Sequence, residues 1–219
     1  PQEIKGLLDS VRHALERIEA NALHGGKIVN DFLNLSQPDR LQREAKEFYL
    51  KDPLDRAIEM VKIKRTIPED ALINQIEENL PSIQGNFVLI QDAFFNLIDN
   101  GTDALELKDK KIKDKELPQP EGGYKGKITV RMYKQNDKII IQIQDNGIGM
   151  DEDTKKRIFV PFFTTKATAQ KGTGLGLYVI QRIIQTHQGE IKIDSEYGKG
   201  TTFTITLPIT QRREENVAS

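Results

Sequence analysis

The chain has 219 residues, enough for one good hydrophobic core with an appendage or for two small domains. Its 32 Lys and Arg nearly cancel its 33 Asp and Glu, so it offers no overall field to gather DNA or RNA. Cysteine is absent, which excludes disulfides and thiolate metal sites, and neither a signal peptide nor an apolar run near the ~20 residues that span a bilayer is present.

The first element that we expect is one long helix over residues 3–36. Apolar residues recur there in steps of three and four, the period of a coiled-coil or bundle seam, so a partner helix is implied. The stripe consists of Ile4, Leu8, Val11, Leu15, Ile18, Ala22, Val29 and Phe32. Each glycine of Gly25-Gly26 destabilises a helix by roughly 1 kcal/mol, so a break or a hairpin at this point is the alternative. The spacing of the apolar residues nevertheless continues across the pair, which favours one helix. Pro38 ends the helix because it disfavours helical geometry in the residue before it.

From about residue 48 the pattern changes to mixed helices and strands. Apolar spacing predicts helices over residues 53–64, 86–107 and 174–186. Alternation predicts strands over residues 73–77, 128–133, 138–144, 190–195 and 201–207. Residues 108–126 are charged and rich in Pro and Gly, which predicts a solvent loop, and residues 151–171 are expected to be mostly irregular.

The motif Asp145-Asn146-Gly147-Ile148-Gly149-Met150 closes one of the predicted strands. A carboxylate at Asp145 can accept a hydrogen bond from the exocyclic amine of adenine, whereas guanine presents a carbonyl at that position. Gly147 and Gly149 let the chain bend and let its backbone approach a flat base. A plain hairpin turn is the alternative, because Asp-Asn-Gly is a common turn sequence, and only the neighbouring motifs outweigh it.

A second glycine cluster, Gly172-Thr173-Gly174-Leu175-Gly176-Leu177, opens a predicted helix. Backbone N–H groups at a helix start bind anions, glycines let phosphate come close, and Lys166 and Lys171 can add charge. A hinge before the helix is the alternative. The spacing matches neither the Walker phosphate loop nor the dinucleotide fingerprint, because no Gly-Lys-Ser/Thr follows and no βαβ unit surrounds it.

Asn96 and Asn100 stand four residues apart on a predicted helix and therefore share one of its faces. An amide oxygen is a hard ligand that suits Mg²⁺, and this ion also binds nucleotide phosphates. Taken alone, the pair reads as two polar residues on an exposed face. Asp99 and Asp103 are weaker candidates of the same kind.

Together these motifs resemble the ATP-binding domain of bacterial sensor histidine kinases, within the wider family that includes DNA gyrase, MutL and the heat-shock chaperone ATPases. The N box of that family resembles residues 96–104, its two glycine boxes residues 145–150 and 172–177, and its F box residues 159–166. The close of the domain resembles residues 189–208. In all, the resemblance covers roughly residues 48–208 in four ordered motifs.

The resemblance implies an α+β fold: a two-layer α/β sandwich with a mixed sheet covered on one side by helices, preceded by the long bundle-forming helix. Residues 151–173 would form a mobile lid over ATP. The implied cofactors are ATP and Mg²⁺, with Asp145 holding adenine, Asn100 ligating the metal ion and Asn96 supporting it. The implied nucleotide-binding residues are Asp145, Gly147, Gly149, Phe163, Thr164, Thr165, Lys166, Lys171, Gly172, Thr173, Gly174, Leu175, Gly176 and Leu177.

Position 96 separates branches of the wider family. The gyrase-like ATPases carry a glutamate there that activates water for hydrolysis, whereas this chain has Asn96, as the kinases do. The resemblance therefore favours phosphoryl transfer to a protein over ATP-driven clamping.

The histidines depart from the kinase pattern. Residues 3–36 resemble the second helix of the kinases' dimerisation hairpin, but the family's phosphoacceptor histidine is followed by an acidic residue and soon a proline. His13, His24 and His187 do not match. We expect all three to be structural or surface residues, with the phosphoacceptor upstream of Pro1 or absent.

These interpretations divide the chain into a partial dimerisation helix (1–40), an ATP-binding catalytic domain (41–212) and a C-terminal tail (213–219). We expect the catalytic part of a sensor histidine kinase, with a response regulator and, in the full-length protein, a second copy as partners, and no nucleic acid. The alternatives are an ATP-gated interaction module without kinase activity and an ATP-hydrolysing clamp. The expected location is cytoplasmic, with a membrane anchor in the parent protein left open.

Overall fold

A computed structural model describes residues 45–65, 67–165 and 173–209, together with residues 11–12, 14–15, 18, 22 and 25–26 near the N-terminus. The described residues of that N-terminal stretch are helical. Most of the helix predicted over residues 3–36 lies outside the described residues, and so do the domain boundaries expected at residues 40–41 and 212–213.

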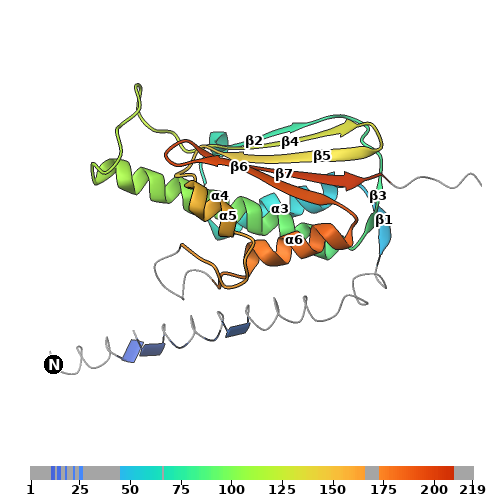
Figure 1. Cartoon of the computed structure of the whole chain (residues 1–219), viewed down its shortest axis with the longest axis horizontal. Coiled ribbons are helices and arrows are strands. Elements are labelled where there is room, and N and C mark those ends of the chain that lie inside the picture. Colours follow the sequence, from blue (N-terminus) through green and yellow to red (C-terminus); the bar gives the residue numbers. More distant parts are fainter. Residues whose placement is uncertain are drawn as a thin grey trace, which may run out of the picture.

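The centre of the fold is a five-stranded mixed sheet in the order β2-β4-β5-β7-β6 (Figure 1). Its strands are β2 (Leu72–Ile76), β4 (Ile128–Gln135), β5 (Lys138–Asp145), β6 (Glu190–Glu196) and β7 (Gly200–Pro208). β2 runs parallel to β4, and the other neighbours pair antiparallel. A two-stranded antiparallel sheet of β1 (Lys46–Phe48) and β3 (Ile83–Gly85) stands apart from it.

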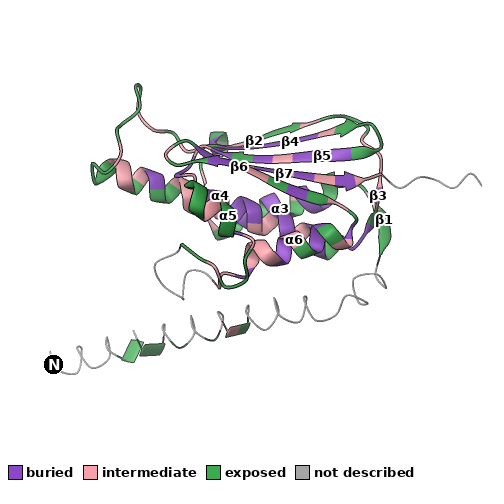
Figure 2. Ribbon diagram, viewed as in Figure 1, coloured by how far each residue is buried: buried purple, intermediate pink, exposed green. Residues whose placement is uncertain are grey.

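The helices gather on one face of the large sheet (Figure 1). They are α3 (Lys51–Lys64), α4 (Phe87–Lys113), α5 (Glu152–Arg157) and α6 (Gly176–Thr186), with a short 3₁₀ turn η1 (Glu69–Ala71). Figure 2 shows buried residues where α3, α4 and α6 meet the sheet. This arrangement confirms the predicted α+β sandwich with a mixed sheet.

Alternating apolar residues explain why one side of β5 packs against the helices. Ile139, Ile141 and Ile143 alternate along it and are all buried in the core. Along α4 the apolar side chains recur at helical spacing and fill the same core, which contains Ile90, Phe94, Leu97 and Ile98. The last residue on the buried side of β5 is Asp145, so the sheet carries a carboxylate at the edge of its core.

The predicted loop over residues 108–126 is wrong in its first part. α4 continues to Lys113, beyond the predicted end at residue 107. The apolar spacing stops at residue 107, but the mostly charged residues 108–113 still form helix. An ion pair between Lys113 and Asp109 supports the last turns.

Three short elements escaped sequence reasoning. β1 and β3 have three residues each, too few to show a period, and α5 has six within the stretch predicted to be mostly irregular. Asp151 caps α5, since its side chain accepts a hydrogen bond from the Thr154 amide at 2.7 Å.

Candidate nucleotide site

Asp145 lies at the end of β5 and is only 7% exposed. Its Oδ1 accepts a hydrogen bond from the Gly147 amide at 2.8 Å, and the Thr201 backbone donates another. Burial raises the pKa of this carboxyl to about 6, against the opposing effect of those donors and of the Lys108 ammonium. A buried carboxylate with donors on one side is suited to recognising one further donor on a ligand.

Gly147 lies against helix α4. A Cβ there would come within 2.7 Å of the Ala104 backbone, and the next residue, Ile148, donates its amide to the Ala104 carbonyl at 3.0 Å. Glycine is required because the turn touches the helix directly. The first glycine cluster is thereby docked on the helix that carries Asn96 and Asn100.

Gly149 lies against the opposite wall of the site. Its φ is 67°, in the left-handed region, and a Cβ would overlap the Glu196 carbonyl. The turn after β6 also holds this segment, because the Gly198 amide donates to the Ile148 carbonyl at 2.6 Å. The first glycine cluster is therefore wedged between α4 and the β6–β7 hairpin.

Asn96 and Asn100 lie on α4 and are half-buried. The side-chain nitrogen Nδ2 of Asn96 donates to the backbone carbonyl of Asp92 at 2.8 Å, which orients the Asn96 side chain along the helix. Beside Asn100, Gly101 packs so closely that a Cβ would lie 3.7 Å from the Asp145 Cβ. The sequence motifs around residues 96–101 and 145–149 therefore meet in space.

Asp99 and Asp103, the weaker metal candidates, take part in an ion-pair cluster. Arg65 contacts Asp99 at 3.0 Å and Asp103 at 2.5 Å, and Lys64 contacts Asp99 at 2.7 Å. These pairs join the end of α3 to α4. Their geometry indicates a structural role, since both carboxylates already have cationic partners.

The segment that resembles the F box follows α5. Phe163 packs partly against the core, and the Arg157 guanidinium lies 4.4 Å from the centre of its ring. Its neighbour Phe162 is 72% exposed and has a φ of 65°. Thr164 and Thr165 are exposed.

The second glycine cluster is described from Thr173 onward. Gly174 has a φ of 68°, and a Cβ there would overlap the backbone of Phe162, so the F-box segment and this cluster touch. The Thr173 hydroxyl accepts from the Leu175 amide at 3.1 Å. Leu175 is buried, and Leu177 packs against the core. Gly176 begins α6, and no described residue outside that helix and its chain neighbours lies within 4 Å of where its Cβ would stand.

Three of the expected phosphate-binding residues lie outside the described residues. They are Lys166, Lys171 and Gly172. The described part of the cluster still places the N-terminus of the eleven-residue helix α6 directly after Gly174 and Leu175.

His187 has a structural place at the end of α6. It is 8% exposed, its Nε2 accepts from the Asn86 amide at 2.9 Å, and its Nδ1 lies 2.7 Å from the Ile183 carbonyl. Nδ1 therefore carries the proton, and burial lowers the pKa of the ring. This geometry agrees with the expectation that His187 is not a phosphoacceptor.

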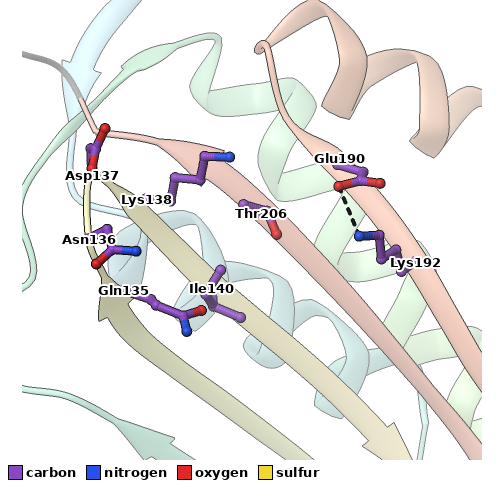
Figure 3. Close-up of a pocket in the computed structure, with 8 residues that line it drawn as sticks. All are labelled: Gln135, Asn136, Asp137, Lys138, Ile140, Glu190, Lys192 and Thr206. Atoms are coloured by element: carbon purple, nitrogen blue, oxygen red, sulfur yellow. Dashed lines mark ion pairs between the residues drawn. The ribbon is translucent and has the colours of Figure 1, made fainter.

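A shallow hollow on the solvent side of the sheet is a separate feature. Figure 3 shows the residues that line it, which are Gln135, Asn136, Asp137, Lys138, Ile140, Glu190, Lys192 and Thr206. It lies at the end of β5 opposite Asp145, and the nearby Glu190 and Lys192 pair at 3.2 Å. It has no contact with the motifs of the candidate site.

Two negative findings hold for the part of the chain that the structure describes. No helix there has the length and apolar character to cross a bilayer. No group of three or more His, Cys, Asp and Glu residues there could hold a metal ion, so an ion at this site would depend on amide oxygens and on the phosphates of a ligand.

Comparison with known sequences points to one family. Residues 85–211 match the family of histidine kinase-, DNA gyrase B- and HSP90-like ATPases. Sporulation kinase E of Bacillus subtilis is 33% identical over 92% of this chain and 23% of its own length. The signal transduction histidine-protein kinase AtoS of Escherichia coli is 31% identical over 87% of this chain and 28% of its own. The chain thus spans about a quarter of the length of these curated relatives.

Comparison with solved structures agrees on the fold. The catalytic domain of the histidine kinase ThkA aligns with a TM-score of 0.58 at 24% identity, over 77% of this chain and 99% of that domain. The likeness thus extends over nearly all of a histidine-kinase catalytic domain.

Proposed function

This chain belongs to the histidine kinase-, DNA gyrase B- and HSP90-like ATPase family, and we propose that it is the ATP-binding catalytic region of a two-component sensor histidine kinase. In this proposal it transfers the γ-phosphate of ATP to a histidine, from which the phosphoryl group passes to an aspartate of a response regulator. Its support is that a sporulation kinase and a signal transduction histidine-protein kinase are 33% and 31% identical to this chain over 92% and 87% of its length.

The observation that carries the proposal is the meeting of two sequence motifs, residues 96–101 and 145–150, at Asp145. This carboxylate lies at the end of β5, Gly101 next to Asn100 packs against it, and the docked turn with Gly147 and Gly149 surrounds it. An adenine amine would donate to Asp145, and a guanine would leave the carboxylate facing another acceptor.

Asn100 would supply one amide oxygen to Mg²⁺, and Asn96 would support it from the preceding turn of α4. The residues fit this ion, because amide oxygen is a hard ligand and Mg²⁺ keeps waters and phosphates as its other ligands. Bound there, the ion would neutralise phosphate charge during transfer.

The remaining expected nucleotide contacts belong to the same proposal. Backbone amides at the start of α6, from Thr173 to Leu177, would receive the phosphates, and Lys166 and Lys171 would add positive charge. Phe163, Thr164 and Thr165 would support the lid. Phosphoryl transfer in such a site depends on positioning and on charge neutralisation.

The acceptor histidine is not His187, because its ring is buried and both of its nitrogens lie in hydrogen bonds. His13 and His24 lie outside the described residues. We propose residues 1–40 as part of a dimerisation hairpin and residues 41–212 as the catalytic domain, followed by the tail at 213–219. A second copy and a response regulator are the proposed partners, and the cytoplasm, which supplies ATP, is the proposed location.

The test is incubation with γ-labelled Mg-ATP, with and without an added hairpin that carries an acceptor histidine. A kinase labels the added hairpin, and the label is lost in acid and kept in alkali, as phosphohistidine requires. ATP binding without label transfer would instead identify an interaction module. Steady ADP release without any phosphoprotein would identify a hydrolytic clamp.

A further inference from the structure

Lys108 is buried to an unusual degree, with 9% of its surface exposed. Lysine is rarely so buried unless its ammonium has partners, because removing the charge from water is costly. The residue stands on α4, two turns after Asn100. It belongs to none of the sequence motifs that define the candidate site, so its burial needs a separate explanation.

The partner of the Lys108 ammonium is the backbone of the first glycine cluster. Its Nζ donates to the Asn146 carbonyl at 2.8 Å, next to Asp145 in the chain. The Tyr124 hydroxyl donates to the same carbonyl at 3.3 Å, and the ammonium lies 5.0 Å from the centre of the Tyr124 ring. The Asn146 carbonyl thus accepts hydrogen bonds from an ammonium and from a phenol, one residue after Asp145.

The loop that carries Tyr124 is bound to the same cluster. The Asn146 side chain donates to the Lys125 carbonyl at 2.8 Å and accepts from the Lys127 amide at 2.7 Å. The Asn146 amide donates in turn to the Lys127 carbonyl at 3.1 Å. Tyr124 and Lys125, which fall in the predicted solvent loop over residues 108–126, are therefore attached to the residue after Asp145, with the Tyr124 ring beside the ammonium.

We propose that Lys108 is a positioning residue that keeps Asp145 ionised for adenine recognition, and that Tyr124 holds the Lys108 ammonium in place. This inference rests on the proposed function, because it assigns a second set of residues to the same nucleotide site. In this role Lys108 acts through Asp145 and through the carbonyl of the next residue, Asn146.

Electrostatics support this role. Burial raises the pKa of Asp145 to about 6, and the hydrogen bonds from the Gly147 and Thr201 backbones oppose this rise most. The Lys108 ammonium adds a smaller effect in the same direction. Burial lowers the pKa of Lys108, and the negative charge of Asp145 works against that shift. The other groups nearby are Tyr124, whose pKa is raised by burial and by Asp145, and Asp109, which acts on Tyr124. Without Lys108 the pKa of Asp145 must rise further.

The charge state of Asp145 decides how it meets adenine. The ionised carboxylate offers acceptors only, which match an amine donor. The protonated acid is a weaker acceptor, and with Oδ1 occupied by the Gly147 amide a proton on the other oxygen competes with the amine. ATP affinity should therefore follow the ionised fraction of Asp145 and fall as pH drops through about 6.

The experiment measures Mg-ATP affinity by calorimetry between about pH 5 and about pH 8.5 for the wild type, Lys108→Met, Lys108→Arg and Tyr124→Phe. The matched control is Lys110→Met, which removes an exposed lysine from the same helix. We expect the wild-type midpoint near pH 6 and a higher midpoint for Lys108→Met. A rise of about one unit makes binding at pH 6 about fivefold weaker.

The pH midpoint of ATP binding should stay close to the wild-type value in Lys108→Arg, because the positive charge is kept. It should rise slightly in Tyr124→Phe and stay unchanged in Lys110→Met. An unchanged midpoint in a folded Lys108→Met variant, with only its melting temperature lowered, would overturn the inference and leave Lys108 a structural residue.

A carboxyl ¹³C NMR titration of Asp145 in the ATP-free proteins separates this inference from the proposed function. A higher Asp145 pKa in Lys108→Met or in Tyr124→Phe supports the inference even if the wild type binds no ATP, in which case only the proposed function fails. Equal Asp145 titrations in the wild type and both variants would overturn the inference.

Discussion

The two glycine clusters of the candidate site are held in different ways. Gly147 and Gly149 have protein atoms against them from α4 and from the β6–β7 hairpin. In the second cluster, the described atoms nearest to Gly174 belong to the backbone of Phe162 in the F-box segment. No described residue outside its own helix and chain neighbours lies within 4 Å of where a Cβ on Gly176 would stand. The first cluster thus belongs to the packed sheet-and-helix core, whereas the described part of the second depends on a neighbouring loop segment.

This difference indicates a division of labour. The half proposed to recognise the base is formed without a nucleotide, because its glycines, its carboxylate and Lys108 all make contacts within the protein. The half proposed to bind phosphates presents backbone at the start of α6, with no described residue against Gly176 beyond its chain neighbours and its own helix. A preformed site reduces the entropic cost of binding, because fewer groups must be ordered when the ligand arrives.

The largest effect is expected for Asp145→Ala, which tests whether the preformed half supplies base recognition. ATP affinity should fall by about 10- to 100-fold, because hydrogen bonds to a charged group contribute about 1.5–3 kcal/mol and the adenine amine would lose its acceptor. Calorimetry with Mg-ATP measures this, and circular dichroism checks that the fold is intact. Undiminished affinity would remove the base-recognition role of Asp145.

Substituting glycine in each cluster tests the packing difference directly. Gly149→Ala should destabilise the fold by about 1–3 kcal/mol or prevent folding, because its φ of 67° is strained for alanine and its Cβ would overlap the Glu196 carbonyl. Chemical denaturation gives the free energy of unfolding.

Gly176→Ala is the matched control for that substitution. It should leave the unfolding free energy nearly unchanged, since no described residue beyond its chain neighbours and its own helix lies within 4 Å of the added Cβ, while ATP affinity falls if phosphate approaches this backbone. Equal destabilisation by both substitutions would contradict the contrast between the clusters.

Asn100→Ala tests the metal assignment on the helix that joins the two halves. ATP binding should lose its dependence on Mg²⁺, with an effect of about tenfold at saturating metal, because one amide ligand is removed from an ion that also holds the phosphates. Titrations with and without Mg²⁺ measure the difference. An unchanged metal requirement would exclude Asn100 as a ligand.

The smallest effect concerns His187, which anchors the far end of α6. Because the folded-state pKa of His187 lies below its ordinary value of 6.5, its contribution to stability is complete above that pH and is lost as pH falls. We expect a loss of about 1 kcal/mol on acidification. Asp145 acts in the opposite sense, since its raised pKa favours the fold as pH drops below about 6.

The variant His187→Gln isolates this contribution, because glutamine can accept from the Asn86 amide without titrating. The difference between wild-type and variant unfolding free energies, measured by urea denaturation from about pH 5 to about pH 8, should narrow as pH falls below 6.5. A difference that does not vary with pH would show that His187 is not titrating in this range.

Much of the fold could be predicted from local pattern. The isoleucines of β5 alternate, and the first turns of α4 repeat every three or four residues, so element type follows from period. The end of α4 could not be predicted this way, since residues 108–113 are charged and carry no apolar stripe. Their helix is retained because Lys108 bonds to a carbonyl 38 positions later in the chain.

The order and spacing of the glycine and asparagine motifs were enough to predict a nucleotide site, because each motif consists of neighbours in the chain. The raised pKa of Asp145, the capture of Asp99 and Asp103 by Arg65, and the burial of Lys108 depend on folding. Each arises from groups that only packing brings within a few ångströms, where water is excluded and charges act strongly on one another.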